Sequence, residues 1–508
     1  MHFTKTAVLH LLLVIFLFAI ISFFHVWKIS EIPKGFYVDE LSIGYNALLI
    51  ADTGRDEHKQ FLPIFFKAFG EYKNPLYIYT LALIYKLFGV SEMGLRITSF
   101  IFFLLFLLGT YLLVTNIYRD NKMIPIYVIL CGGFLPWFFT VSRISFEVIS
   151  QLTIVTYSLL FIYRVYHSQL GREKWLNPIS AGVFLGLSIY SYSTARLLSF
   201  LMLISLMGIY LRKDTYKKTS ALCAAFFLMV VPYVVFSVNN PGALTARFKH
   251  ISYVYDPSIS LLQKILIFVG SYSSYFGFDF LLLKGDPNLR HATGYGGELF
   301  IPVFLLSIIG LICCMIRRDL FRDKFLLFMF INMLLSPVAA SLTKAGLGPH
   351  ALRSIMLGLF ILFFSCYGLS FFFSIKNNLL KNILISVAFA VLVFQACFYL
   401  NDYFTRYRET SIGWFESYDF KNTLITAIER QPEVIVISPF SNQPYILLAF
   451  YNYFISNPRQ VPIYVAKNMI PLTNTCVIYF KNDPLHKLYT TRFHDFSLHD
   501  SIARLGCN

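Results

Sequence analysis

AVLHLLLVIFLFAIISFFHVW, residues 7–27, decides the fold. A membrane-spanning helix needs about 20 apolar residues, because the hydrocarbon core of a bilayer is about 30 Å thick. The stretch runs on through Phe23, Phe24 and Trp27, beyond the shorter apolar core of a cleaved signal peptide. It therefore predicts a retained transmembrane helix, and Lys5 before it predicts a cytoplasmic N-terminus.

The composition extends this interpretation to most of the chain. Of the 508 residues, 57% are hydrophobic and only 14% are charged, whereas about a quarter of an average soluble domain is charged. A soluble protein of this length has too little interior to hide so much apolar surface. The composition excludes a disordered protein, a disulfide-framework protein and an ordinary cytosolic enzyme, and it predicts a polytopic membrane protein.

Further apolar runs predict ten more spans, which makes about eleven transmembrane helices. They lie near residues 97–117, 123–141, 148–165, 176–192, 197–211, 219–238, 298–316, 325–342, 354–374 and 382–400. Two other apolar segments, 75–89 and 261–283, are predicted to lie in the membrane interface. The first is too short to span upright, and the second carries several polar residues.

The basic excess, a formal net charge of +16, supports this topology. With eleven spans and the N-terminus inside, every predicted inner loop is short and rich in Lys and Arg, as the positive-inside rule requires. Most of the excess then lies in these loops, which removes the reason to expect a nucleic-acid partner. The same arrangement places the C-terminal tail and the long loops at 28–94 and 239–297 on the extracytoplasmic side.

The chain divides into a transmembrane domain, residues 1–400, and an extracytoplasmic tail, residues 401–508. The tail is less apolar and is predicted to form a small α/β domain. Strands are expected at 433–439 and 476–480, and helices at 419–430 and 442–454. Cys476 and Cys507 are the two tail cysteines, and they are weak candidates for a disulfide.

The spans themselves contain few ionisable residues, which argues against ion-coupled transport. The polar groups gather on the outer side, first in FYVDELSIGYNALL (36–49). Its adjacent Asp39 and Glu40 have an ordinary explanation, because acidic residues suit a helix N-terminus. Where the chain leaves the membrane, however, a carboxylate could also accept a proton from an acceptor hydroxyl.

Two further outer segments combine charged side chains. In VSRISFEV (141–148), Arg143 and Glu147 are four residues apart, so they could pair on a continuous helix or could each have a direct role in the site. In SLTKAGLGPHALRSI (341–355), Lys344, His350 and Arg353 surround the start of a helix. Cations are unfavourable there for the helix itself, so the cluster favours a phosphate site.

Three remaining outer segments supply weaker candidates. KAFGEYKNP (67–75) carries Glu71 and Lys73, which ordinary interfacial placement would also explain. YSYSTARLL (190–198) carries Tyr192 and Arg196, and tyrosines are common at membrane interfaces. The Gly-rich segment 281–300 could be a solvated loop or a ligand loop; its polar residues are Asp286, Arg290 and His291.

In this order and spacing, the sequence resembles the protein O-mannosyltransferase and aminoarabinose-transferase superfamily of GT-C glycosyltransferases. The resemblance covers roughly residues 1–400, and the ordered set is more specific than any single motif. The residues that carry it are Asp39–Glu40, Pro75, Leu95–Arg96, Ser142–Arg143 with Glu147, and the cluster of Lys344, His350 and Arg353.

The resemblance implies a GT-C fold and the transfer of a sugar, with inversion, from a polyprenyl-phosphate donor to an acceptor on the outer side. It implies that Asp39 is the base, with Glu40 and Glu147 as further catalytic candidates. The donor phosphate would be held by outer cations: Lys344, His350, Arg353, Lys73, Arg143, Arg290 and His291. Asp286, Tyr192 and Arg196 would contribute to the substrate loop.

One departure from the family concerns metal binding. Aminoarabinose transferases carry a Glu-Lys pair directly before the proline that matches Pro75, and that Glu can help to hold a metal. Here Lys73 and Asn74 occupy these places, and Glu71 lies further back as a weak candidate ligand. We therefore expect that no cofactor is required, and a divalent metal stays doubtful.

The function expected from the sequence is inverting sugar transfer to a hydroxyl or amine of a protein, lipid or glycan. The expected partners are the polyprenyl-phosphate sugar and membrane lipids, with no nucleic acid. Alternatives are a lipid-linked-sugar polymerase or ligase of the wider GT-C group and, less favoured, a lipid-linked-sugar flippase. The sugar and the acceptor stay open.

Overall fold

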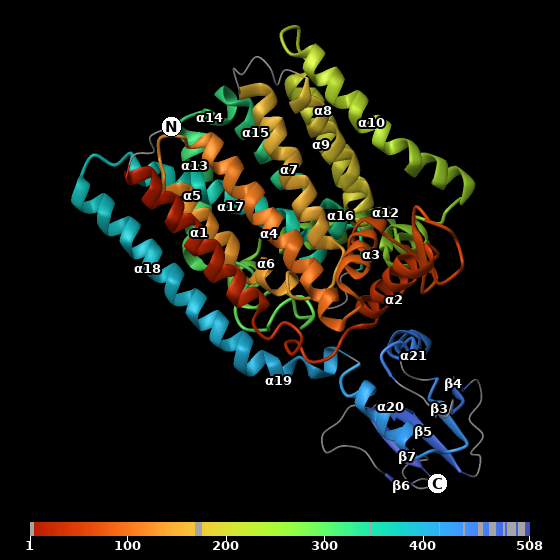
Figure 1. The fold of residues 1–508 in the computed structure, drawn as a ribbon. Helices are drawn as coiled ribbons and strands as arrows, with labels where there is room; N and C mark the ends of the chain where they lie inside the picture. The colour runs from red at the N-terminus through yellow and green to blue at the C-terminus, as the bar shows by residue number, and fades with distance from the viewer. Residues whose placement is uncertain are drawn as a thin grey trace.

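The computed structural model describes residues 5–167, 175–344, 348–415, 417–439, 442–455, 461–466, 474–480, 483–484, 494–495 and 503–507. It shows a bundle of long helices with a small sheet-containing unit at one end (Figure 1). In Figure 1 this unit lies beside the end of the bundle that carries α2 (Val38–Thr53) and α3 (Pro75–Phe88).

All eleven segments predicted as spans are helical. The long ones are α1 (Lys5–Val26), α4 (Glu92–Ile117), α7 (Val148–His167), α10 (Tyr216–Asn239), α15 (Lys324–Leu335) with α16 (Val338–Ser341), α17 (Ala351–Phe373) and α18 (Asn378–Asp402). The shorter ones are α8 (Leu176–Leu187) with η1 (Ser188–Tyr190), α9 (Ala195–Tyr210) and α13 (Ile301–Ile316). The predicted polytopic helical fold is confirmed.

The remaining predicted span is bent. Helices α5 (Met123–Phe134) and α6 (Pro136–Val141) meet at an angle of 56°. Pro136 causes the break, because a proline disfavours helical geometry at the residue before it. Leu135 accordingly has an extended ψ of 131°.

By length and composition, eight helices among the described residues could cross a membrane, or nine if the bent pair is one span. This set includes Leu261–Leu283, formed by α12 (Leu261–Ser274) and η3 (Asp279–Leu283). Residues 75–88 form α3, which is too short for that set. The placement of both segments in the membrane interface stays a prediction.

The centre of the bundle is formed by α7 and α17. About 72% and 78% of their apolar windows are buried, against 17% for α1 and α18 at the periphery. Glycines allow α13 to lie directly against α17, since a Cβ on Gly368 would come within 1.9 Å of the Leu306 carbonyl oxygen. Both central helices begin at the end of the bundle where the outer polar residues gather.

The first outer segment is compact. After α2 come the hairpin strands β1 (Phe66–Ala68) and β2 (Glu71–Lys73), which pair antiparallel, and then α3. Pro75 occupies the first turn of α3, where its missing N–H costs nothing. Leu41 of α2 and Leu81 of α3 are fully buried in the shared core, so the two helices pack against each other as one layer.

The other outer and connecting elements are short. They are α11 (Ala246–Ile251), η2 (Tyr253–Tyr255) and α14 (Asp319–Arg322). After α18 the chain continues through η4 (Tyr403–Tyr407), α19 (Arg408–Thr410) and η5 (Ile412–Trp414). The continuous helical path runs past residue 400, and the division of the chain at that residue stays a prediction.

The tail contains the predicted α/β unit. Its elements are α20 (Phe420–Glu429), β3 (Val434–Ile437), α21 (Pro444–Tyr451), β4 (Ile463–Val465), β5 (Thr475–Phe480), β6 (His494–Asp495) and β7 (Ala503–Cys507). The strand order is β4-β3-β5-β7-β6, with β3 parallel to β4 and β5 and with β7 antiparallel to β5 and β6. The predicted strands and helices are confirmed. Cys476 and Cys507 lie opposite each other and form a disulfide.

Candidate active site

Asp39 lies in the first turn of α2, where the helix dipole favours a carboxylate. Its Oδ1 accepts a hydrogen bond from Lys73 Nζ at 2.6 Å, and its side chain remains 24% exposed. Burial raises the pKa of Asp39, but the Lys73 ammonium together with Arg247 and Arg290 holds the pKa below its usual value. Asp39 is therefore an ionised and accessible carboxylate.

Glu147 is linked to the same site through Asn74. Its two carboxylate oxygens accept hydrogen bonds from the Asn74 backbone N–H at 2.6 Å and from Asn74 Nδ2 at 2.9 Å. Arg196 donates to Asn74 Oδ1 at 2.7 Å. Burial raises the pKa of Glu147 to about 7, against the opposing effect of Lys73. Asp39, the adjacent Lys73 and Asn74, Glu147 and Arg196 come from four sequence segments. They form one polar network that ends at Asp39.

Two arginines of the outer loops add positive charge. Arg247 of α11 pairs with Glu71 of β2, and its charge also acts on the Asp39 carboxylate. The guanidinium of Arg290 lies over the Tyr37 ring, 4.0 Å from its centroid, and 5.5 Å from the Trp414 ring centroid. Arg290 likewise favours the charged form of Asp39. The base candidate therefore lies in a positive field supplied by separate loops.

A third group forms where α17 begins. Asp286 Oδ2 accepts hydrogen bonds from His291 Nδ1 at 2.7 Å and from the Ala351 backbone N–H at 2.8 Å. The His291 and His350 rings stack with their centroids 4.5 Å apart. Burial lowers the pKa of His350 well below its usual value, and nearby positive groups add to this; they are His291, Arg353, Arg247 and Arg290. His350 is therefore a neutral imidazole.

Asp286, His291 and His350 could in principle hold a metal ion, since their ligand atoms lie within 4.8 Å of one another. Carboxylate and imidazole are common Zn²⁺ ligands. The local arrangement does not suit a cation, however. Asp286 Oδ2 is already occupied by two N–H donors, and three arginines act on His350. The surroundings fit an anion better than a divalent cation.

The remaining predicted site residues lie around this centre. Arg353 donates to Thr343 Oγ1 at 2.8 Å. Tyr192 is close enough for Arg353, Arg247, Glu147 and Asp39 to affect its titration. Lys344 lies at the edge, because its ammonium is 3.4 Å from Asp256 and its side chain is 56% exposed. The structure thus brings together most of the predicted residues, with Lys344 peripheral.

Arg143 requires a correction. The predicted pairing with Glu147 is wrong, because the chain is not helical between Val141 and Val148. Arg143 is fully buried and donates to the carbonyl oxygens of Phe24, His25 and Trp27 at 2.6–2.8 Å, all at the end of α1. A cation suits a helix C-terminus. Its position gives no support to a contact with the donor phosphate.

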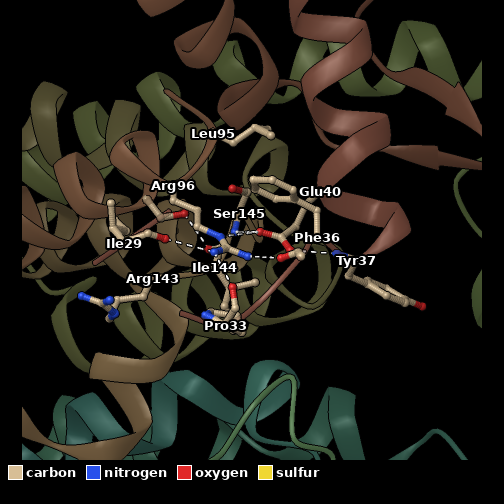
Figure 2. A network of polar contacts seen from close by, with 12 residues as sticks. Ile29, Pro33, Phe36, Tyr37, Glu40, Leu95, Arg96, Arg143, Ile144 and Ser145 are labelled. Atoms are coloured by element: carbon tan, nitrogen blue, oxygen red, sulfur yellow. Dashed lines mark hydrogen bonds and ion pairs between the residues drawn. The ribbon is translucent and has the colours of Figure 1, made fainter. Parts of the chain in front are cut away.

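Glu40 belongs to a different polar network, which is centred on Arg96 (Figure 2). Its side chain is fully buried, and its oxygens accept from Arg96 Nε at 3.4 Å and from the backbone N–H groups of Ser145 and Tyr37 at 2.9 Å. Arg96 in turn donates to the carbonyls of Ile29, Pro33 and Gly35. With every oxygen occupied by the scaffold, Glu40 is positioned to hold α2 and not to accept a proton from substrate.

Several residues of the site were missed by sequence reasoning. Arg247 could have been considered, because it is an arginine in the second long loop between predicted spans. Its partner Glu71 is 176 residues away in the sequence, so no local pattern links the two. Asn74 was noted only as a departure from the family pattern. Its role appears when both Glu147 oxygens and Arg196 are seen to meet its side chain and backbone. Tyr37 was not singled out, although it supports Arg290.

Comparison with known proteins supports the resemblance. Residues 72–236 match the family model for dolichyl-phosphate-mannose-protein mannosyltransferase. No curated protein sequence matches the chain. This matched segment contains Lys73, Glu147 and Arg196, three members of the polar network.

Solved structures with a similar fold include ArnT from Cupriavidus metallidurans in the apo state, with a TM-score of 0.56, 12% identity and 97% coverage of both chains. The same protein bound to undecaprenyl phosphate has a TM-score of 0.56 and 11% identity, again with 97% coverage of both. The archaeal oligosaccharyltransferase AglB from Archaeoglobus fulgidus, in complex with an inhibitory peptide and a dolichol-phosphate, has a TM-score of 0.52 and 14% identity. That match covers 92% of this chain and 69% of AglB. The predicted resemblance is confirmed: part of the chain matches the mannosyltransferase family model, the fold is similar to those of ArnT and AglB, and the chain is an integral, multi-pass membrane protein.

Proposed function

We propose that this chain transfers a sugar, with inversion, from a polyprenyl-phosphate-linked donor to an acceptor hydroxyl or amine at the extracytoplasmic membrane surface. The observation that carries the proposal is the placement of Asp39. It is an ionised, partly exposed carboxylate within a cluster of cations from separate loops. The similarity to ArnT, a structure solved with undecaprenyl phosphate bound, supports the class of donor.

A single base is enough for this reaction. The acceptor oxygen or nitrogen attacks the anomeric carbon from the face opposite the phosphate, and its proton passes to the Asp39 carboxylate. The bond between the anomeric carbon and the phosphate oxygen breaks, and the lipid phosphate leaves with its electron pair. Because no covalent sugar–enzyme intermediate is needed, a second carboxylate in contact with the sugar is not required.

The cations would stabilise the departing phosphate. Arg353, Arg290 and Arg247 would supply guanidinium N–H donors to the phosphate oxygens, and neutral His350 can donate one N–H. Lys73 has a second role in this proposal. When the anionic donor arrives, the Lys73 ammonium moves from Asp39 to the phosphate, which frees the carboxylate to act as the base. Stabilisation of developing charge by such fixed groups is commonly the largest contribution to catalysis.

The acceptor would be a protein, a lipid or a glycan. It would approach between α2 and the tail, because Trp414 and Tyr37 meet Arg290 there. The alternative is a polymerase or ligase of the wider GT-C group with a diphosphate donor, which the same cluster would also suit. A flippase is less favoured, since the polar network is at one end of the bundle.

The test is Asp39→Asn in purified protein with a polyprenyl-phosphate sugar as donor. We expect turnover to fall by about 10²–10⁴-fold, the range for loss of a general base. The matched control is Asp52→Asn, an exposed residue on the same helix, which should leave turnover unchanged. Undiminished turnover in Asp39→Asn would exclude the assignment. Mass spectrometry of lipid-linked sugars that accumulate without the protein would identify the donor.

A further inference from the structure

A cavity of about 590 Å³ lies at the other end of the helix bundle from Asp39. Its lining comes from the C-terminal ends of α7 and α9, the start of α15, and Tyr367 of α17. Helix α7 begins beside Glu147 and reaches the cavity at His167, about 30 Å away at 1.5 Å per residue. Figure 1 shows α14 and the start of α15 at the end of the bundle away from α2 and α3.

The buried phenol of Tyr210 lines this cavity near Asp323, whose charge acts on it. Tyr210 is only 1% exposed, and its hydroxyl has no hydrogen-bond partner within the described part of the chain. The ring cannot readily turn away, because it stacks on Tyr166 with the centroids 3.6 Å apart. The Tyr210 carbonyl also accepts from the hydroxyl of Thr219 at 3.1 Å. A buried polar group without a partner costs stability, so this hydroxyl indicates a missing ligand atom.

The charges around the phenol favour a cation. Three carboxylates line the cavity, from Asp214, Asp319 and Asp323, together with the side chains of Arg322, Lys324 and His167. His167 Nε2 lies 3.7 Å from Asp323 Oδ1, and the Tyr367 hydroxyl donates to Asp319 Oδ2. Burial raises the pKa of Asp323, but the His167 side chain and the backbone N–H groups of Leu326 and Phe325 lower it further, to below its usual value. Asp323 is therefore ionised where it faces the cavity.

The size and arrangement of the carboxylates argue against a bare metal ion. Cavities of this volume usually hold small organic molecules. Among the described residues, these carboxylates do not come close enough together to form a ligand set for a metal. The rings of Tyr166, Tyr210 and Tyr367 add aromatic surface, which attracts organic cations.

We propose that this cavity binds the ammonium group of an organic ligand, with Asp323 and Asp319 as counter-charges and the Tyr210 hydroxyl as a hydrogen-bond partner. The ammonium could belong to a free amine or to the headgroup of an aminophospholipid, since both present the same chemistry. The site is separate from the proposed transfer reaction, and it does not depend on that function.

The experiment uses the full-length protein purified in detergent, with spermidine as the probe at fixed ionic strength. We expect saturable binding in calorimetry and a rise in Tm. Tyr210→Phe should weaken binding about tenfold or more, the usual effect of losing a hydrogen bond to a charged group. It should not lower the Tm without ligand, because the hydroxyl it removes makes no bond in the protein.

Two variants keep the outcome interpretable. Tyr166→Phe is the matched control, because it loses a structural bond to the Thr219 hydroxyl at 2.9 Å and should lower the Tm while retaining binding. Asp323→Asn removes the charge but can still cap α15, and it should weaken binding. The proposal would be overturned if the wild type showed no saturable binding. It would also be overturned if Tyr210→Phe and Asp323→Asn bound spermidine as tightly as the wild type.

Nanodiscs distinguish the two sources of the ammonium. If phosphatidylethanolamine discs weaken spermidine binding relative to phosphatidylcholine discs, the occupant in the membrane is the lipid headgroup. If binding is equal in both, the occupant is a free amine. Both readouts are independent of sugar transfer.

Discussion

Asp39 and Glu40 are neighbours in the chain, yet their surroundings differ completely. Glu40 is fully buried, and its oxygens meet Arg96 and two backbone N–H groups. Asp39 is 24% exposed and accepts from one side chain, the Lys73 ammonium. Consecutive residues of a helix point in directions about 100° apart, so Glu40 faces the buried Arg96 and Asp39 faces Lys73.

The difference shows how one acidic pair can serve two purposes. The Glu40–Arg96 network is closed, because Arg96 is also committed to the carbonyls of Ile29 and Pro33. It joins α2, α4 and the end of α1 at one point (Figure 2). The network around Asp39 is open, which means that some of its cations are not paired with a carboxylate. Among the described residues, Arg290 and Arg353 donate to the neutral side chains of Asn288 and Thr343. Fixed scaffold and reactive site are thus adjacent.

The largest expected effect is a loss of stability when the buried ion pair between Glu40 and Arg96 is broken. Glu40→Gln would leave the buried Arg96 charge without a counter-charge, which costs about 3–5 kcal/mol. Asp39→Asn should cost less, because Lys73 still faces Glu147 and Glu71. Thermal unfolding of both purified variants checks this comparison. A Glu40→Gln protein as stable as wild type but without activity would instead place Glu40 in the reaction.

Most of the fold could be predicted from the sequence, whereas only part of the site could. Apolar runs mark helices because the bilayer requires length and hydrophobicity, and all eleven predicted segments are helical. Strands β3 and β5 of the tail were also predicted, from their β-branched and aromatic residues, whereas β4, β6 and β7 were not. These features depend on local sequence alone.

The site depends on contacts between distant segments, which no local pattern reveals. Arg143 and Glu147 have helical spacing, but the backbone around Phe146 is not helical, so the predicted pair does not form. Glu147 instead meets Asn74, and Arg247 meets Glu71 across 176 residues. The sequence singled out charged segments that the structure gathers at one end of the helix bundle, and it could not assign their partners.

A smaller effect, on the kinetics of transfer, is expected from removing the ion pair between Asp39 and Lys73. Lys73→Gln removes the ammonium that lowers the pKa of Asp39, so the acid limb of the kcat/KM profile should move to higher pH. Loss of the phosphate contact should also raise the KM for the donor, by about tenfold to a hundredfold for one charged hydrogen bond. Lys67→Gln on the neighbouring strand, whose side chain is exposed, is the control. An unshifted acid limb would show that Lys73 does not govern the base.

A pH effect on stability is expected from Glu147. Its pKa in the folded protein is about 7, raised from 4.5 by burial, so the folded state holds this proton when the unfolded state has lost it. Glu147 therefore contributes stability below about pH 4.5 that is lost as the pH rises to 7. Glu147→Gln cannot titrate, so its fall in Tm between pH 5 and pH 7.5 should be smaller than that of wild type by a few degrees. Equal falls in Tm would show that the carboxyl is ionised throughout this range.

The smallest effect expected is that of a metal chelator. The group of Asp286, His291 and His350 has the ligand types that bind Zn²⁺, and it lies in the open network beside Asp39. Its Asp286 oxygen, however, is held by the His291 ring and by the Ala351 N–H at the start of α17, and arginines from three segments repel a cation. Incubation with EDTA should therefore leave both turnover and Tm unchanged, and metal analysis should find no stoichiometric zinc in the purified protein. A loss of turnover that only Zn²⁺ restores would mean that these three side chains rearrange around a metal, and that the open network is completed by an ion.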